Sequence, residues 1–101
     1  MRFVSTRDAS ATATLSEALQ RGLAPDGGLY VPERFPRLTP AQFDGAETLP
    51  GVAQRLLAPF FAGDALEPAL GEIVAEAFDF PVPIVPLPAA GPDVGVLELF
   101  H

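Results

Sequence analysis

The sequence predicts an α+β fold in which three or four helices pack on a small, mainly antiparallel sheet. Helix-start residues followed by apolar residues at helical spacing recur over residues 14–79, which predicts the helices. Short β-branched and aromatic runs near 2–6, 29–31 and 94–100 predict the strands. The 101 residues suffice for one domain, 1–101, and 49% of them are apolar, as a folded core requires.

The first helix is expected to begin after Thr14. Thr14 and Glu17 form a T-x-x-E capping box, in which each side chain accepts a hydrogen bond from the backbone N–H of the other residue. Gly22 suits the end of this helix because glycine adopts a left-handed backbone without steric cost. The polar stretch DASATA, residues 8–13, leads to this helix.

A glycine pair follows in the segment LAPDGGLYVPE, residues 23–33. The order proline, aspartate, glycine, glycine predicts a tight turn. A glycine pair can also bring backbone N–H groups to a phosphate, but this pair precedes a strand and lacks the G-x-x-x-x-G-K-[ST] pattern. A plain turn is therefore the preferred interpretation. For Thr6 and Arg7, a solvated strand end is preferred over a ligand contact.

Three further helical segments are expected. A threonine cap followed by proline and glutamine predicts a short helix at 39–42. Residues 50–62 predict a second helix, in which Pro59 distorts the last turn. Residues 68–79 predict the clearest helix, because its apolar residues recur at i, i+3, i+4, i+7 and i+8. These are Leu70, Ile73, Val74, Ala77 and Phe78.

The last quarter of the chain is strongly apolar. The segment FPVPIVPLP, residues 80–88, is predicted to be an extended, packed connector, since its prolines favour edge or polyproline geometry; a proline-motif ligand is the alternative. The final run VGVLELFH, 94–101, places apolar residues on both faces of a strand. A chain with this few strands can scarcely cover both faces of the final strand. We therefore expect that a partner which covers these faces is missing. Glu98 on this strand needs a polar partner, and a salt-bridged structural acid is the preferred interpretation.

Composition argues against several functions. Thirteen acidic and six basic residues give a net charge of −7, which disfavours nucleic acid and anionic membranes as partners. All the basic residues are arginine, and without lysine the chain cannot form a Schiff base with a carbonyl cofactor. The chain has no cysteine, no apolar run of about 20 residues and no signal-like start. We expect a soluble protein of the cytoplasm.

No self-sufficient active site is expected. The sole histidine, His101, is far in sequence from the serines at positions 5, 10 and 16, and no metal-ligand spacing is present. We therefore assign no catalytic, cofactor-binding or metal-binding residue from these patterns.

Five segments together resemble the amino-terminal region of threonine synthase. They are FVSTR, EALQRGLAPDGGLYVPE, FFAGD, EIVAEAF and LELFH. The resemblance runs in order and spacing from residue 2 to residue 101, and threonine synthase-like paralogues share it. Asp8 departs from the pattern, since many members have glycine after S-T-R, which leaves the geometry of that turn open.

The resemblance implies a function for a larger protein. Threonine synthase is a pyridoxal-phosphate lyase of threonine biosynthesis that converts O-phospho-L-homoserine and water to L-threonine and phosphate. In the family, LELFH leads into G-P-T-x-A-F-K-D, whose lysine holds the cofactor. We therefore expect an N-terminal domain that ends just before this segment, binds no cofactor itself, is not catalytic and packs beside the catalytic domains. Glu98 and His101 lie nearest to that lysine in sequence and are the candidate residues close to the active site. For His101, an indirect or structural role is preferred over substrate contact.

A second hypothesis is a stand-alone protein-interaction module derived from the same domain. Its terminal strand could pair with a partner or with a second copy of the chain. For the N-terminal fragment, we expect the apolar surface that the missing partner leaves exposed to favour self-association.

Overall fold

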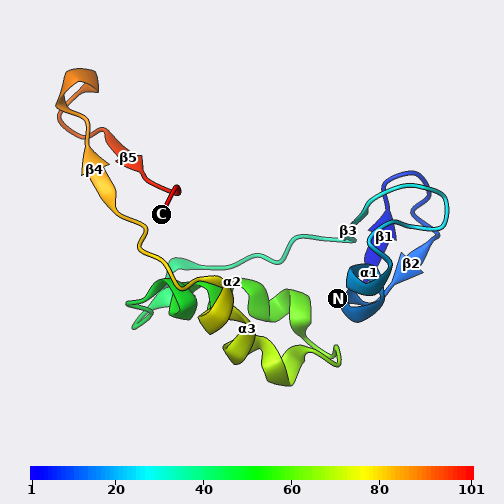
Figure 1. Cartoon of the computed structure of the whole chain (residues 1–101). Coiled ribbons are helices and arrows are strands. Elements are labelled where there is room, and N and C mark those ends of the chain that lie inside the picture. Colours follow the sequence, from blue (N-terminus) through cyan, green and yellow to red (C-terminus); the bar gives the residue numbers. More distant parts are fainter.

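The computed structural model describes residues 1–101 and contains three α-helices and two small antiparallel sheets. The predicted α+β class is confirmed, but the strands form two sheets and not one (Figure 1). Short 3₁₀ turns at Pro40–Phe43, Glu67–Ala69 and Pro88–Ala90 complete the elements. In chain order the strands and helices are β1 (Phe3–Ser5), β2 (Thr12–Ala13), α1 (Leu15–Arg21), β3 (Tyr30–Pro32), α2 (Leu49–Phe61), α3 (Leu70–Ala77), β4 (Ile84–Pro86) and β5 (Gly95–Leu97).

The first sheet has the strand order β2-β1-β3, with both pairs antiparallel. Phe3 lies opposite Ala13 on one side and Pro32 on the other. Phe3 and Ser5 are buried, so one face of the sheet belongs to the core. The strand β2, in the polar stretch before Thr14, was not among the expected strands. Backbone pairing with β1 makes a strand there despite the polar side chains.

The predicted start of α1 is confirmed. Thr14 Oγ1 accepts a hydrogen bond from Glu17 N at 3.2 Å, and Glu17 Oε2 accepts one from Thr14 N at 2.9 Å. Together these bonds satisfy two backbone donors at the helix start. Gly22 follows the helix with φ +72°, and its N–H donates to Ala18 O.

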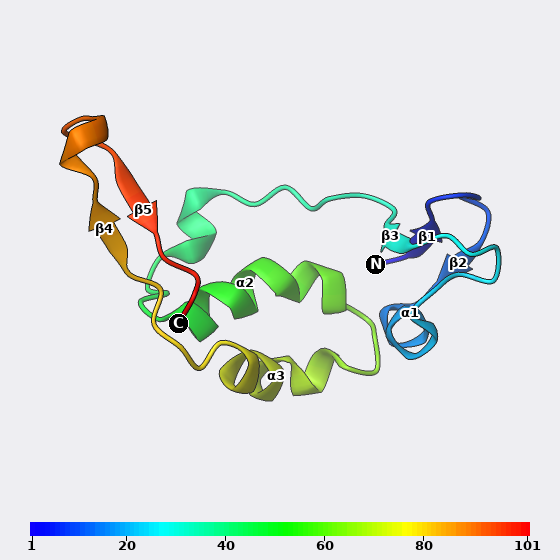
Figure 2. The ribbon, with the colours of Figure 1, turned by 45° about the horizontal axis from the view of Figure 1, so that its top comes forward.

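Helices α2 and α3 lie side by side (Figure 2). Thr48 begins α2, where its Oγ1 accepts a hydrogen bond from Gly51 N at 3.2 Å. The 3₁₀ turn that contains Pro68 leads directly into α3, so the helix predicted at 68–79 is confirmed in its position. The connector from β3 to α2 touches this pair, because the Phe35 ring lies edge-on to Phe60 at 6.3 Å.

The hydrophobic core joins the first sheet and α1 to the helix pair. It is small: 11 of 101 residues are buried. The radius of gyration is 17.0 Å, whereas a compact domain of this length has about 13 Å. The chain is therefore elongated, with little interior of its own. The core residues are Phe3, Ala13, Leu15, Ala18, Ala53, Phe61, Leu70 and Val74.

One aspartate makes a polar joint between α1 and the α2–α3 loop. Asp64 Oδ2 accepts a hydrogen bond from Ser16 N at 3.0 Å, and its Oδ1 accepts bonds from Ser16 Oγ and from Leu66 N. The Ser16 hydroxyl and these backbone donors lower the pKa of Asp64 below its usual value. The charged form of Asp64 therefore fixes the first turn of α1 on this loop.

The second sheet is the hairpin of β4 and β5, which projects away from the helices (Figure 1). The last strand was expected at 94–100 beside the N-terminal strands. It spans only 95–97 and pairs with β4, because a strand pairs most easily with a neighbour across a short turn. The edge-strand geometry expected near 80–88 is confirmed. The expected packing of this segment is not observed, since β4 is exposed. None of the helices has the length and apolar surface needed to cross a membrane.

Candidate functional site

Both faces of the β4–β5 hairpin carry exposed apolar side chains. Ile84 lies opposite Leu97 on one face, and Val85 lies opposite Val96 on the other. The exposed fractions are 72% for Ile84 and 53% for Leu97, with 42% and 44% for the two valines. The sequence-based expectation of two apolar faces is thus confirmed, and neither face is covered within these 101 residues. Further exposed apolar residues of the hairpin region are Leu87, Val94, Leu99 and Phe100.

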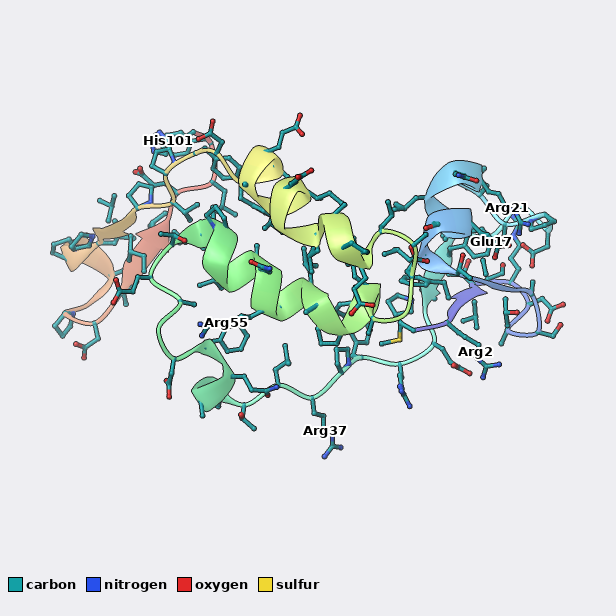
Figure 3. All side chains as sticks on the ribbon, turned by 90° about the horizontal axis from the view of Figure 1, so that it is seen from below. Arg2, Glu17, Arg21, Arg37, Arg55 and His101 are labelled. Atoms are coloured by element: carbon teal, nitrogen blue, oxygen red, sulfur yellow. The ribbon has the colours of Figure 1, made fainter.

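The two candidate site residues lie together at the base of this hairpin. His101 Nε2 is 3.0 Å from Glu98 Oε2, and the two form an ion pair when the histidine is protonated. Glu98 N donates to Pro83 O at 3.0 Å, so Glu98 is held by the hairpin backbone. The His101 ring also packs against Phe100, with ring centroids 4.6 Å apart. Figure 3 shows His101 near the chain end, on the side of the molecule where the hairpin lies.

A second polar cluster closes the turn that contains the glycine pair. Asp26 Oδ1 accepts hydrogen bonds from Ser5 Oγ and from Gly28 N, both at 2.8 Å. The Gly28 N–H, followed by the Ser5 hydroxyl, holds the pKa of Asp26 below its usual value. Arg7 Nη1 donates to the backbone oxygen of Asp26 at 3.1 Å. Asp26 Oδ2 is buried without a hydrogen-bond partner.

These bonds support the prediction of a plain turn. Gly27 has φ +78°, as the turn requires, and donates its N–H to Ala24 O at 2.8 Å. The N–H of Gly28 is already bound to Asp26 and does not point toward open space for a phosphate. The contact between β1 and this turn was missed from the sequence, because residues 5 and 26 are brought together only by the pairing of β1 with β3.

The largest surface groove has a volume of about 630 Å³ and runs along α2. Arg55 on this groove donates to the backbone oxygens of Gln42 and Asp44, so its guanidinium already holds the preceding 3₁₀ turn (Figure 3). The groove contains no nucleophile paired with a base, and no group of three His, Asp or Glu side chains is placed to bind a metal. The lining residues are Gly45, Ala46, Glu47, Thr48, Gly51, Gln54, Arg55 and Ala58.

Comparison with known proteins places the chain in a family. The family model described as "Threonine synthase N terminus" matches residues 2–78. The chain belongs to the threonine synthase family. It is 36% identical to threonine synthase of Pseudomonas aeruginosa over 105 residues, which covers 100% of the chain and 22% of that protein. It is 34% identical to the human protein threonine synthase-like 2, again over 100% of the chain and 22% of the relative.

Solved structures of the family share the fold of the whole chain. The crystal structure of threonine synthase from Escherichia coli matches with a TM-score of 0.84 and 27% identity. The pyridoxal-phosphate-bound threonine synthase from Brucella melitensis matches with a TM-score of 0.81 and 35% identity. Both matches cover 100% of this chain and 23% of the solved chain. The chain thus spans about a fifth of the length of these relatives.

Proposed function

We propose that residues 1–101 are the N-terminal domain of a threonine synthase-like enzyme, and that this domain packs beside the catalytic domains without performing chemistry itself. The parent enzyme then converts O-phospho-L-homoserine and water to L-threonine and phosphate in the cytoplasm. The observation that carries the proposal is the hairpin with two uncovered apolar faces, in a chain that spans 22% of its relatives.

The energetics of the hairpin support a packing role. Seven of its aliphatic side chains are between 41% and 72% exposed. Full burial of one such side chain contributes about 1.5–3 kcal/mol, so covering the exposed half of all seven is worth roughly 5–10 kcal/mol before the cost of ordering. An apolar surface whose burial is this favourable is expected to be covered in the functional protein. The seven are Ile84, Val85, Leu87, Val94, Val96, Leu97 and Leu99.

The residues of this chain do not fit the pyridoxal phosphate cofactor of the family. The chain has no lysine for a Schiff base. The glycine pair offers no phosphate cradle, since a Cβ on Gly28 would lie 2.2 Å from Ser5 Oγ and the Gly28 N–H is bound to Asp26. In our proposal the cofactor is held by the remainder of the parent enzyme, and no catalytic step is assigned to residues 1–101.

Glu98 and His101 are proposed to lie near the active site of the parent enzyme as positioning residues. Their mutual contact of 3.0 Å supports a joint role, because each restrains the side chain of the other. In the parent enzyme, His101→Gln is expected to move the pH profile of kcat, since it removes the imidazole and keeps a hydrogen-bonding side chain. A parent enzyme whose pH profile and kcat are both unchanged would contradict this role.

An activity assay tests the proposal. The 101-residue chain, mixed with pyridoxal phosphate and O-phospho-L-homoserine, is expected to release no phosphate and to show no aldimine absorbance. The full-length parent enzyme under the same conditions is the positive control. Phosphate release by the 101-residue chain would contradict a non-catalytic role.

The exposed hairpin also supports a second candidate, a stand-alone protein-interaction module. The two candidates differ in the reading frame that encodes the chain. A codon series for G-P-T-x-A-F-K-D directly after His101 supports the N-terminal domain, whereas a stop codon there supports the module.

A further inference from the structure

We propose that a β-strand from the remainder of the parent protein pairs with the outer edge of β5, and that the outer edge of β4 receives no strand. This inference rests on the proposed function, since the added strand belongs to the catalytic part on which the hairpin docks. The hairpin and the catalytic part are then joined through the outer edge of β5.

The hydrogen bonds of the hairpin define which backbone groups face inward. Leu87 N donates to Val94 O at 2.8 Å, and Glu98 N donates to Pro83 O at 3.0 Å. In an antiparallel pair, bonded residue pairs alternate with unbonded ones. Residues 94, 96 and 98 of the β5 side therefore direct their backbone groups toward β4.

The residues between them direct their N–H and C=O groups outward. On the β5 side these residues are Gly95, Leu97 and Leu99, and each has an N–H. Their donors and acceptors recur at every second residue, which is the spacing that an incoming strand needs. The β5 edge is therefore open along its whole length.

The outer edge of β4 is different. Its outward positions are Val82, Ile84, Pro86 and Pro88, and the two prolines have no N–H. Proline within a sheet is confined to edges whose N–H side stays unpaired. The hairpin thus has one edge that accepts a strand and one edge that stops the sheet.

The two apolar faces indicate that the hairpin lies between two layers, and its open edge distinguishes β5 from β4 as the inner strand. A strand that is apolar on both faces belongs to a sheet with layers on both sides. An inner strand has a neighbour on each edge, and β4 provides only one. Since the solved relatives match the shape of the whole chain and are about four times as long, the second neighbour is assigned to the remainder of the parent. An unpaired open edge would otherwise favour aggregation.

Hydrogen exchange tests this assignment, measured residue by residue in the 101-residue chain and in the full-length parent. The amides of Gly95, Leu97 and Leu99 are expected to exchange at least about tenfold more slowly in the parent, because a buried strand bond must open first. The amides of Val82 and Ile84 are expected to lack a ladder bond in both proteins. Protection of Ile84 with unchanged exchange at Leu97 overturns the inference.

Two matched proline variants provide an independent test. Leu97 and Ile84 lie opposite each other, and neither N–H takes part in the hairpin ladder. Leu97→Pro and Ile84→Pro are therefore expected to have similar effects on the 101-residue chain. In the parent, Leu97→Pro is expected to lower Tm by roughly 2–4 °C more than Ile84→Pro, because only Leu97 loses a bond to the added strand. Equal Tm values for the two parent variants overturn the inference.

The outcomes also separate this inference from the proposed function. If the parent buries the hairpin faces while the Leu97 amide exchanges as in the 101-residue chain, the strand pairing is wrong and the packing role survives. If the faces also stay exposed, both are wrong. Protection of Leu97 that grows with the concentration of the 101-residue chain, and is absent from the parent, identifies a second copy as the occupant and overturns the inference.

Discussion

Replacing Gly28 with alanine tests whether the turn at 25–28 and the start of β1 form one rigid unit. Gly28 has no left-handed φ, so the change carries no backbone strain and acts through its added Cβ alone. That Cβ would lie 2.2 Å from Ser5 Oγ, 3.0 Å from Asp26 Oδ1 and 3.1 Å from Arg7 N. Real Cβ atoms do not approach other atoms at 2.2 Å, so the Ser5 hydroxyl must move.

The expected loss of stability follows from these contacts. Ser5 is buried, and its hydroxyl donates to Asp26 and accepts from Arg7 N. Moving it disrupts two hydrogen bonds that are worth about 1 kcal/mol each, and overpacking adds about 1–3 kcal/mol. The total loss of about 3–5 kcal/mol is large compared with the free energy of unfolding of a small domain, whose lower limit is about 5 kcal/mol. Tm is expected to fall by roughly 15–30 °C.

Chemical denaturation followed by circular dichroism measures this loss. Gly71→Ala is the matched control, because Gly71 lies inside α3 and its added Cβ would meet only Gln54 Nε2 at 3.7 Å. That variant is expected to gain about 1 kcal/mol from helix propensity. Ser5→Ala combined with Gly28→Ala should destabilise by less than the sum of the single changes. A Gly28→Ala variant within about 0.5 kcal/mol of the original chain, which is the range of a neutral surface change, would refute the steric argument.

Three further predictions concern the core, the polar joint and the hairpin. Leu70→Ala, which removes a side chain that is 5% exposed, is expected to cost about 2–5 kcal/mol in denaturant unfolding; a loss below about 1 kcal/mol would mean that the core does not depend on α3. The pKa of Asp64 is lowered in the folded chain, so its stabilising effect is present above the unfolded pKa of about 4 and is lost as pH falls below it. Unfolding midpoints from pH 7 to pH 2 should therefore show a smaller acid-dependent loss for Asp64→Asn than for the original chain, and parallel curves would contradict the joint. A chain shortened to residues 1–80 is expected to keep its cooperative thermal transition, because every core residue precedes that cut; loss of the transition would show that the hairpin supports the core.

Local sequence signals were sufficient for the helices. Thr14 with Glu17 marks the start of α1 through bonds between residues three apart, so the signal lies within a short stretch of sequence. Proline at position 68 and the apolar spacing after it likewise mark α3. These features are encoded within a single turn of the chain, so the sequence alone can predict them.

The partners of the strands were not predictable in the same way. The final strand was expected beside the N-terminal strands, and it pairs with β4 across a turn instead. The two-residue strand β2 has no alternating pattern and exists because β1 offers its edge. The contact of Glu98 with His101, three residues apart, depends on the course of the chain after β5, which periodicity does not specify. Pairing is a property of the whole chain, whereas sequence patterns report on neighbours.

Thiol labelling measures most directly whether the hairpin is a docking element of the parent enzyme. The chain has no cysteine, so Ile84→Cys and Val96→Cys each place a single reporter in residues 1–101, one on each face of the hairpin. Both reporters are expected to react rapidly in the 101-residue chain and to be protected in the full-length parent, with the labelled peptide identified by mass spectrometry. Equal labelling rates in the two proteins, on either face, would contradict the packing role.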